Sequence, residues 1–249
     1  MPLSATIAAT LALGLALGCA SSAYADTADK PDWHYRDGEA AENWSAANPG
    51  YALCDQGKMQ SPVDLSAIAT RGTVRFAAAY GPAPAKLALG PGKVKVEVGP
   101  GLGLIHAGRL FPLRQVHFHT PAEHKLHGKR YPLAAHFAHA TDGGQLAVLG
   151  VKFDTGAENP ALQVLLDAAT AGTDSFELDF AQLAPHDPAV YRYMGSLTTP
   201  PCTEGVNWFI ADRVLTASEA QIAALAARLG TSNRSLQPLN GRLVLAPED

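Results

Sequence analysis

The sequence predicts one sheet-dominated domain with a few peripheral helices, which is the mainly β type of α+β fold. Short runs of alternating apolar and polar residues recur along the chain, and glycine (23 residues) and proline (18 residues) are spread throughout. Stretches rich in both, such as 81–84 and 99–101, separate some of these runs, as turns separate strands. No internal repeat or low-complexity linker divides the sequence, so a single domain is expected.

Five runs have the pattern of strands. Successive side chains of a strand point to opposite faces, so residues two apart share a face. The expected strands, in chain order, are 94–98, 116–119, 133–138, 146–151 and 206–210.

Two helices are expected beside the sheet. Ser218 and Gln221 match the capping box that starts a helix, and Gly230 is a suitable stop. Between them, one apolar stripe is formed by Ile222, Leu225, Ala226 and Leu229. Residues 160–170 predict the other helix. We expect both helices to serve as packing elements.

The first 25 residues predict a secretory signal peptide. They contain no charged side chain, and an apolar run at 7–18 is followed by small residues up to Ala25. The run is too short to span a bilayer. Cleavage after Ala25 would leave residues 26–249 as the mature domain, in the periplasm or secreted. The segment before the run lacks the usual Lys or Arg.

Cysteine usage agrees with export. Cys19 also hints at lipoprotein processing, but Ala16 and Leu17 fit that site poorly. Without the signal peptide, Cys54 and Cys202 remain, and an even pair in an exported chain predicts a disulfide rather than two free thiols. A loop of about 150 residues closed in this way gives roughly 4–5 kcal/mol of stabilisation as a ceiling. The net charge of −4 has no basic block, which argues against a nucleic-acid partner.

Histidines concentrate in one segment. Six of the nine lie between positions 117 and 139, namely His117, His119, His124, His127, His136 and His139. A lone histidine on a strand is usually satisfied by ordinary hydrogen bonds, and a single H-x-H pattern is a weak signal. Clustering on this scale argues against chance but does not choose a metal.

Strand alternation brings three of these histidines together. His117 and His119 share one strand face, and His136 lies in the next expected strand. If 126–130 turns the chain, the strands lie side by side and three imidazoles meet. Three imidazoles with a fourth position open are typical of catalytic zinc, whereas structural zinc sites are usually closed by cysteines.

Other short motifs lie before and after the histidine segment. In chain order, the set is 33–35, 43–44, Cys54, 60–64, the histidine segment, 193–202, 206–208 and 237–242. With these motifs the chain resembles the α-class carbonic anhydrases, especially their exported bacterial members, over nearly all of the mature region. The resemblance implies a twisted, mostly antiparallel central sheet with zinc at the base of a conical cleft. It also implies a Cys54–Cys202 disulfide and cis peptide bonds before Pro62 and Pro201.

The resemblance implies an enzyme that hydrates carbon dioxide reversibly to bicarbonate and a proton through zinc-bound hydroxide. His117, His119 and His136 would bind the Zn²⁺ ion. The alternative is a non-catalytic or weakly active binding module of the same family. Such relatives usually lose a zinc ligand, whereas all three are present here together with Thr198 and Glu123. We expect no membrane span. The sequence leaves open whether the protein is a monomer or a dimer.

Other roles are implied residue by residue. The hydroxyl of Thr198 would accept a hydrogen bond from the nucleophile and donate one to Glu123, and Thr199 would contact bicarbonate. Gln115 and His124 would be outer partners of the zinc ligands. The apolar wall for carbon dioxide would comprise Ala138, Val148, Leu197, Val206 and Trp208, although each taken alone is better explained by core packing.

Two positions depart from the family pattern. The family commonly has a Glu two residues before the third ligand, accepting its free N–H, where this chain has Ala134. A proton-shuttle histidine is expected around 90–93, where this chain has none. His34 is a possible substitute, but a plain surface role is the favoured interpretation.

Overall fold

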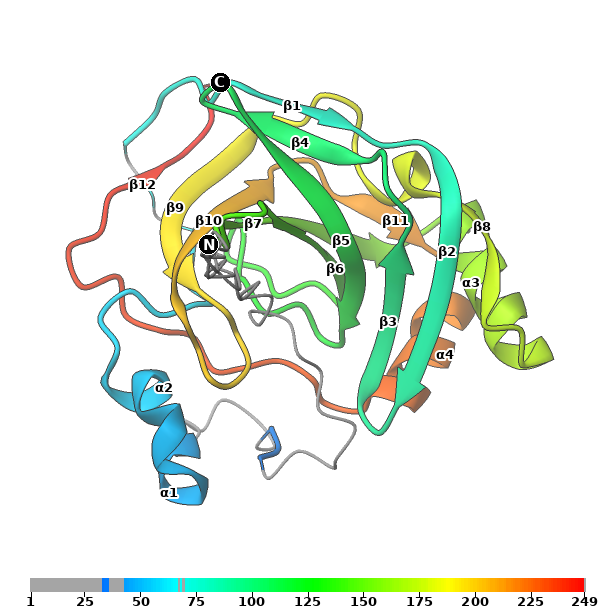
Figure 1. Cartoon of the computed structure of the whole chain (residues 1–249), viewed down its shortest axis with the longest axis horizontal. Coiled ribbons are helices and arrows are strands. Elements are labelled where there is room, and N and C mark those ends of the chain that lie inside the picture. The colour runs from blue at the N-terminus through cyan, green and yellow to red at the C-terminus, as the bar shows by residue number, and fades with distance from the viewer. Residues whose placement is uncertain (1–32, 36–42, 67, 69, 249) are drawn as a thin grey trace, which may run out of the picture. The chain divides into compact units, whose positions relative to one another are not determined.

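Strands dominate the computed structural model, which describes residues 33–35, 43–66, 68 and 70–248. All of these belong to one compact unit (Figure 1). The predicted signal peptide, with Cys19 and Ala25, lies outside the described residues. Within the described ranges, no helix has the length and hydrophobicity that crossing a bilayer requires.

The strands of the described residues form one sheet of twelve. Its main path runs β12 (Val244–Leu245), β9 (Val190–Ser196), β10 (Glu204–Ala211), β7 (Leu146–Thr155), β6 (Leu133–Ala140), β5 (Arg109–His119), β3 (Lys93–Val98), β2 (Pro82–Gly90) and β8 (Ser175–Asp179). Off this path lie β1 (Phe76–Ala79), β4 (Gly103–His106) and β11 (Leu215–Ala217). Among the described strand pairs, the parallel ones are β7 with β10 and β7 with β11. The expected mostly antiparallel sheet is therefore confirmed, and all five expected strands lie within observed ones.

The centre of the sheet is covered on both faces. Every residue of β6 is buried, as are the first eight of β7, which explains their nearly continuous apolar sequences. One face carries the larger core, which includes Val116, Phe118, Leu133, Ala135 and Phe137. The other face carries a smaller core around Trp208 and Tyr193. The alternation expected for the two histidine strands is thus observed.

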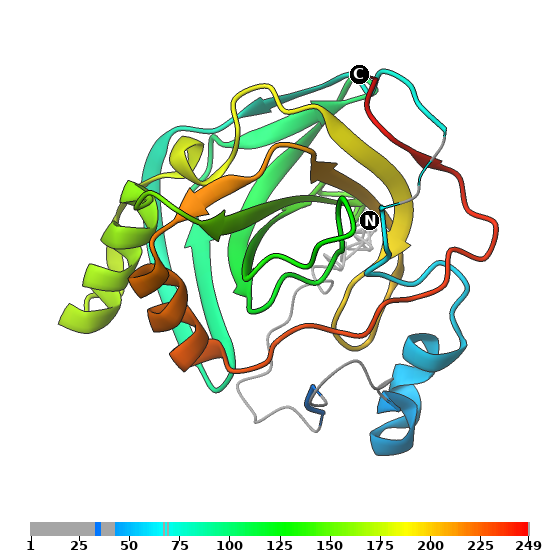
Figure 2. The same ribbon diagram turned by 180° about the vertical axis from the view of Figure 1, so that it is seen from behind.

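The two longer helices cover the larger core. Leu162 and Leu165 of α3 (Pro160–Ala171) and Leu225 of α4 (Glu219–Leu229) belong to it. Burying one such side chain contributes about 1.5–3 kcal/mol. The expected capping box at Ser218 and Gln221 is present. Figure 2 shows both helices together at one side of the sheet, next to β2 and β3.

Several short features were not expected. They are α1 (Trp44–Ala47), η1 (Pro49–Tyr51), α2 (Ala52–Gln56) and η2 (Phe180–Leu183). Each is too short to show a helical period in sequence. The Cys54–Cys202 disulfide is formed. The peptide bonds before Pro62 and Pro201 are cis as expected, and the bond before Pro121 is a third that was not expected.

Candidate metal centre

The antiparallel pairing of β5 with β6 brings the three predicted histidines together. In the β5–β6 pairing, His117 and His136 are direct cross-strand partners. The chain reverses through a bridge between Leu126 and Lys129, where Gly128 has a positive φ of 74°. One nitrogen each from His117, His119 and His136 lies within 4.8 Å of the others. The sheet therefore converges three imidazoles on one point.

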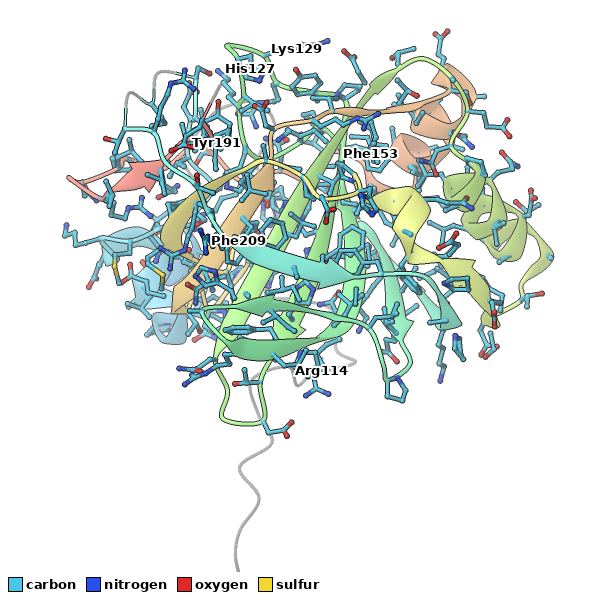
Figure 3. All side chains as sticks on the ribbon, turned by 90° about the horizontal axis from the view of Figure 1, so that it is seen from above. Arg114, His127, Lys129, Phe153, Tyr191 and Phe209 are labelled. Carbon is cyan, nitrogen blue, oxygen red and sulfur yellow. A yellow bond between two sulfur atoms is a disulfide. The ribbon has the colours of Figure 1, made fainter. Side chains whose placement is uncertain are left out.

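Two of the other clustered histidines, His127 and His139, lie away from this point. His127 is exposed and pairs with Asp212 at 3.0 Å, and Figure 3 shows it beside Lys129. His139 points into the larger core, where its ring nitrogens contact Tyr80 Oη at 3.0 Å and the Ala147 carbonyl at 3.2 Å. Burial lowers the pKa of His139 to about 3. Proximity in sequence therefore does not by itself select the ligands.

Hydrogen bonds determine which ring nitrogen of each histidine faces the point where the three imidazoles converge. His117 Nδ1 lies 3.1 Å from Gln115 Oε1, and His119 Nδ1 lies 2.5 Å from the Ser232 carbonyl oxygen. Because both oxygens are acceptors, these Nδ1 atoms donate and leave the Nε2 lone pairs free. His136 instead presents Nδ1, which lies 3.7 Å from Glu123 Oε2. The inward donor set is two Nε2 atoms and one Nδ1.

This donor set fits a divalent cation. His119 Nε2 and Glu123 Oε2 are buried, 3.6 Å apart, and neither hydrogen-bonds any described residue. A nitrogen lone pair facing a carboxylate oxygen in a dry site is unfavourable unless a proton or cation lies between them. Burial also lowers the pKa of His117 and of His136 well below its usual value. Neutral imidazoles are the form that binds metal, and three of them suit zinc.

Glu123 is held by residues from two later segments of the chain. The backbone N–H of Arg234 donates to Glu123 Oε1 at 3.0 Å. Burial raises the pKa of Glu123, while His119, the Arg234 N–H and the Thr198 hydroxyl oppose this rise. Thr198 is itself buried, in the connection between β9 and β10. The predicted pair of Thr198 and Glu123 is therefore brought together beside the imidazoles.

Two partners of the site carry no recognisable motif. Ser232 orients His119, and Arg234 binds Glu123. The guanidinium of Arg234, 1% exposed, also donates to the carbonyl oxygens of Ser61 and Cys54 at 2.7 and 2.5 Å. Sequence reasoning missed both residues because these contacts join segments more than 100 positions apart, which local patterns do not record.

The expected apolar wall lies on the same sheet face as the histidines. Val148, Val206 and Trp208 belong to one buried cluster, and Leu197 packs against it half-buried. Ala138 is buried on β6, two residues after His136, but outside that cluster. Thr199 is half-buried next to Thr198.

The remaining expected residues occupy varied positions. His124 lies beside His136, but its Nε2 contacts Tyr193 Oη at 2.6 Å. Ala134 is buried on the His136 face of β6. Residues 90–93 form the turn between β2 and β3 and include no histidine. His34 is exposed, and its carbonyl oxygen accepts a hydrogen bond from Trp44 Nε1.

The chain is similar to known proteins over most of its length. The family described as eukaryotic-type carbonic anhydrase matches residues 39–248. The carbonic anhydrase of Nostoc sp. is 36% identical over 225 residues, covering 86% of this chain and 85% of its own length. That of Pectobacterium atrosepticum is 32% identical over 227 residues, covering 89% and 93%. The structure of the Photobacterium profundum alpha-carbonic anhydrase superimposes with a TM-score of 0.75 at 38% identity, covering 86% and 99%.

Proposed function

The chain belongs to the α-class carbonic anhydrase family, and we propose that His117, His119 and His136 hold its zinc ion. As a member of this family the protein is an enzyme that interconverts carbon dioxide and bicarbonate. The observation that carries the zinc assignment is the convergence of three nitrogen atoms within 4.8 Å, beside a buried carboxylate. Zinc bound there supplies a Lewis acid that makes water acidic, an established property of carbonic anhydrases as a class.

Thr198 and Glu123 orient the nucleophile. A hydroxyl has one proton to donate, and the Thr198 hydroxyl lies close enough to Glu123 to lower its pKa. When Thr198 donates to Glu123, its oxygen can act toward the nucleophile only as an acceptor. The nucleophile then directs its own O–H at Thr198 and a lone pair at the carbon of carbon dioxide.

Outer contacts fix the imidazoles themselves. Gln115 and the Ser232 carbonyl hold Nδ1–H of His117 and His119, so each ring keeps one tautomer and one orientation. Removing such a partner typically costs about 10–100-fold in metal affinity or activity. The apolar wall around Val148, Val206 and Trp208 receives carbon dioxide. Thr199 contacts bicarbonate.

Proton export limits turnover in this proposal. The turn at 90–93 has no histidine to carry the proton away. Turnover in weak buffer is therefore expected to be low and to rise with imidazole concentration. Turnover that does not depend on buffer would show that a residue of the chain carries the proton, and His34→Ala is the first variant to measure.

The mature protein works outside the cytoplasm in this proposal. The apolar, uncharged first 25 residues predict export and cleavage near Ala25. The Cys54–Cys202 disulfide supports an oxidising compartment. The first residue of protein recovered from the periplasm or medium tests the cleavage site, and a mature chain that still begins at Met1 contradicts it.

One experiment tests the enzyme and the zinc assignment together. Zinc content and stopped-flow hydration of carbon dioxide are measured on one purified sample. We expect one zinc per chain and hydration that a chelator abolishes. A folded wild-type protein that binds no zinc contradicts the assignment.

A further inference from the structure

A small cavity lies beside the imidazole of His136. Its volume is about 10 Å³, and His124, Ala134, His136, Gly150 and Lys152 contribute to its lining. That volume is about the space that the centre of one water molecule can occupy. The cavity is at the position where β6 carries the small side chain of Ala134, directly opposite Lys152 on β7.

Two histidines that line this cavity each have one ring nitrogen with no hydrogen bond to a described residue. His136 uses Nδ1 toward Glu123, and no described residue hydrogen-bonds its Nε2. The Cδ2 atom next to that Nε2 faces Gly150, since a Cβ added at Gly150 would lie 3.7 Å from it. His124 uses Nε2 toward Tyr193, and the described part of the chain offers no partner to its Nδ1. A polar atom left without a hydrogen bond inside a protein destabilises the folded state.

We propose that this cavity binds one water molecule, which accepts the outer N–H of His136 and donates to Nδ1 of His124. The inference rests on the proposed function in one respect, that His136 binds zinc through Nδ1 and so carries its proton on Nε2. A water in a polar site with two to four partners is the usual way in which buried groups of this kind are satisfied. Lys152 is not counted among the partners, because its ammonium donates to the Ala211 carbonyl.

The direction of every neighbouring hydrogen bond agrees with this water. If His124 Nδ1 accepts from the water, its Nε2 carries the proton and donates to Tyr193 Oη at 2.6 Å. Tyr193 then donates its own hydroxyl to Ser61 Oγ at 2.8 Å. Each proton has one acceptor, so one chain of hydrogen bonds runs from His136 through the water to Ser61. The water thus does for His136 what Gln115 and Ser232 do for the other two ligands.

Two isosteric substitutions isolate the polar contact. Ala134→Val and Ala134→Thr place side chains of the same shape at the cavity and displace the water, but only threonine brings an oxygen that can accept the N–H. We expect zinc-loaded Ala134→Val to release zinc to a chelator about 10–100-fold faster than wild type, and Ala134→Thr to stay near wild type. Near-ultraviolet circular dichroism and zinc content check that both variants fold and load.

Two results would overturn the inference. One is equal zinc release from folded Ala134→Val and Ala134→Thr. The other, which needs no variant, is a high-resolution crystal structure of the zinc-loaded wild type with no ordered water between His136 Nε2 and His124 Nδ1. If wild type binds no zinc at all, the proposed zinc assignment fails instead, so the two failures are distinguishable.

Discussion

Strand β6 carries two buried histidines whose surroundings are opposite. His136 and His139 are 2% and 0% exposed, and burial lowers the pKa of both. His139 faces the larger core, where Tyr80 and the Ala147 carbonyl occupy both of its ring nitrogens. His136 faces two other imidazoles and a carboxylate, and none of the described groups donates to it or accepts from it by a hydrogen bond. Burial and neutrality are therefore common to structural and functional histidines, and the unsatisfied, convergent nitrogen distinguishes the functional one.

Loss of a zinc ligand should have the strongest effect of the variants considered. His136→Ala, like His119→Ala, is expected to abolish zinc binding and hydration, because two imidazoles cannot hold the ion. His139→Leu is the matched control on the other face of the strand. It should keep zinc and activity while lowering the free energy of unfolding by about 1–3 kcal/mol, since Tyr80 loses its partner. Metal analysis, stopped-flow hydration and urea unfolding measure these outcomes, and full activity in either alanine variant would refute the assignment.

A smaller loss of rate is expected at Thr198. Thr198→Ala removes the acceptor that orients the nucleophile, and misplacement of a reacting group costs about 100-fold in rate. Thr198→Ser keeps the hydroxyl and should retain most of the activity. Zinc content should be unchanged in both variants. Loss of zinc from Thr198→Ala would mean that Thr198 supports the ligands rather than the reaction.

His139 should contribute to the pH dependence of the free energy of unfolding. The pKa of His139 falls from 6.5 to about 3 on folding. Between these values the unfolded chain binds a proton that the folded chain refuses, so stability falls as pH falls, by up to about 1.4 kcal/mol per pH unit. His139→Leu should flatten the slope of unfolding free energy between pH 6.5 and 4 by about that amount. Parallel slopes for wild type and variant would contradict this account of His139.

A substitution next to His136 should have the weakest effect. Ala134→Glu places a carboxylate two residues before His136 on the same strand face, where it can accept the outer N–H in place of the proposed water. A charged acceptor raises the basicity of the imidazole more than water does, so zinc release to a chelator should slow by up to about tenfold. Unchanged or faster release from a folded Ala134→Glu protein would show that the site has no room or no need for the carboxylate.

The sequence predicts the converging part of this site but not its supports. Alternation along 116–119 and 133–138 places His117, His119 and His136 correctly, because the two-residue period of a strand is a local property. Ser232 and Arg234 act through backbone groups on a distant loop, which leave no trace in side-chain patterns. The cavity beside Ala134 likewise depends on side chains from β6 and β7 and on His124, so only the three-dimensional packing reveals it.

The contacts of Ser232 and Arg234 also bear on how the protein is made. Ribosomes synthesise chains from the N-terminus, so the three histidines and Glu123 emerge well before the residues that orient His119 and bind Glu123. An emerging chain can pair β5 with β6 early, yet its metal centre lacks two of its fixed partners until Ser232 and Arg234 are available. Products truncated before residue 232 would carry every zinc ligand and still have an incompletely oriented site. Tight zinc capture is thereby coupled to synthesis of the chain as far as Arg234.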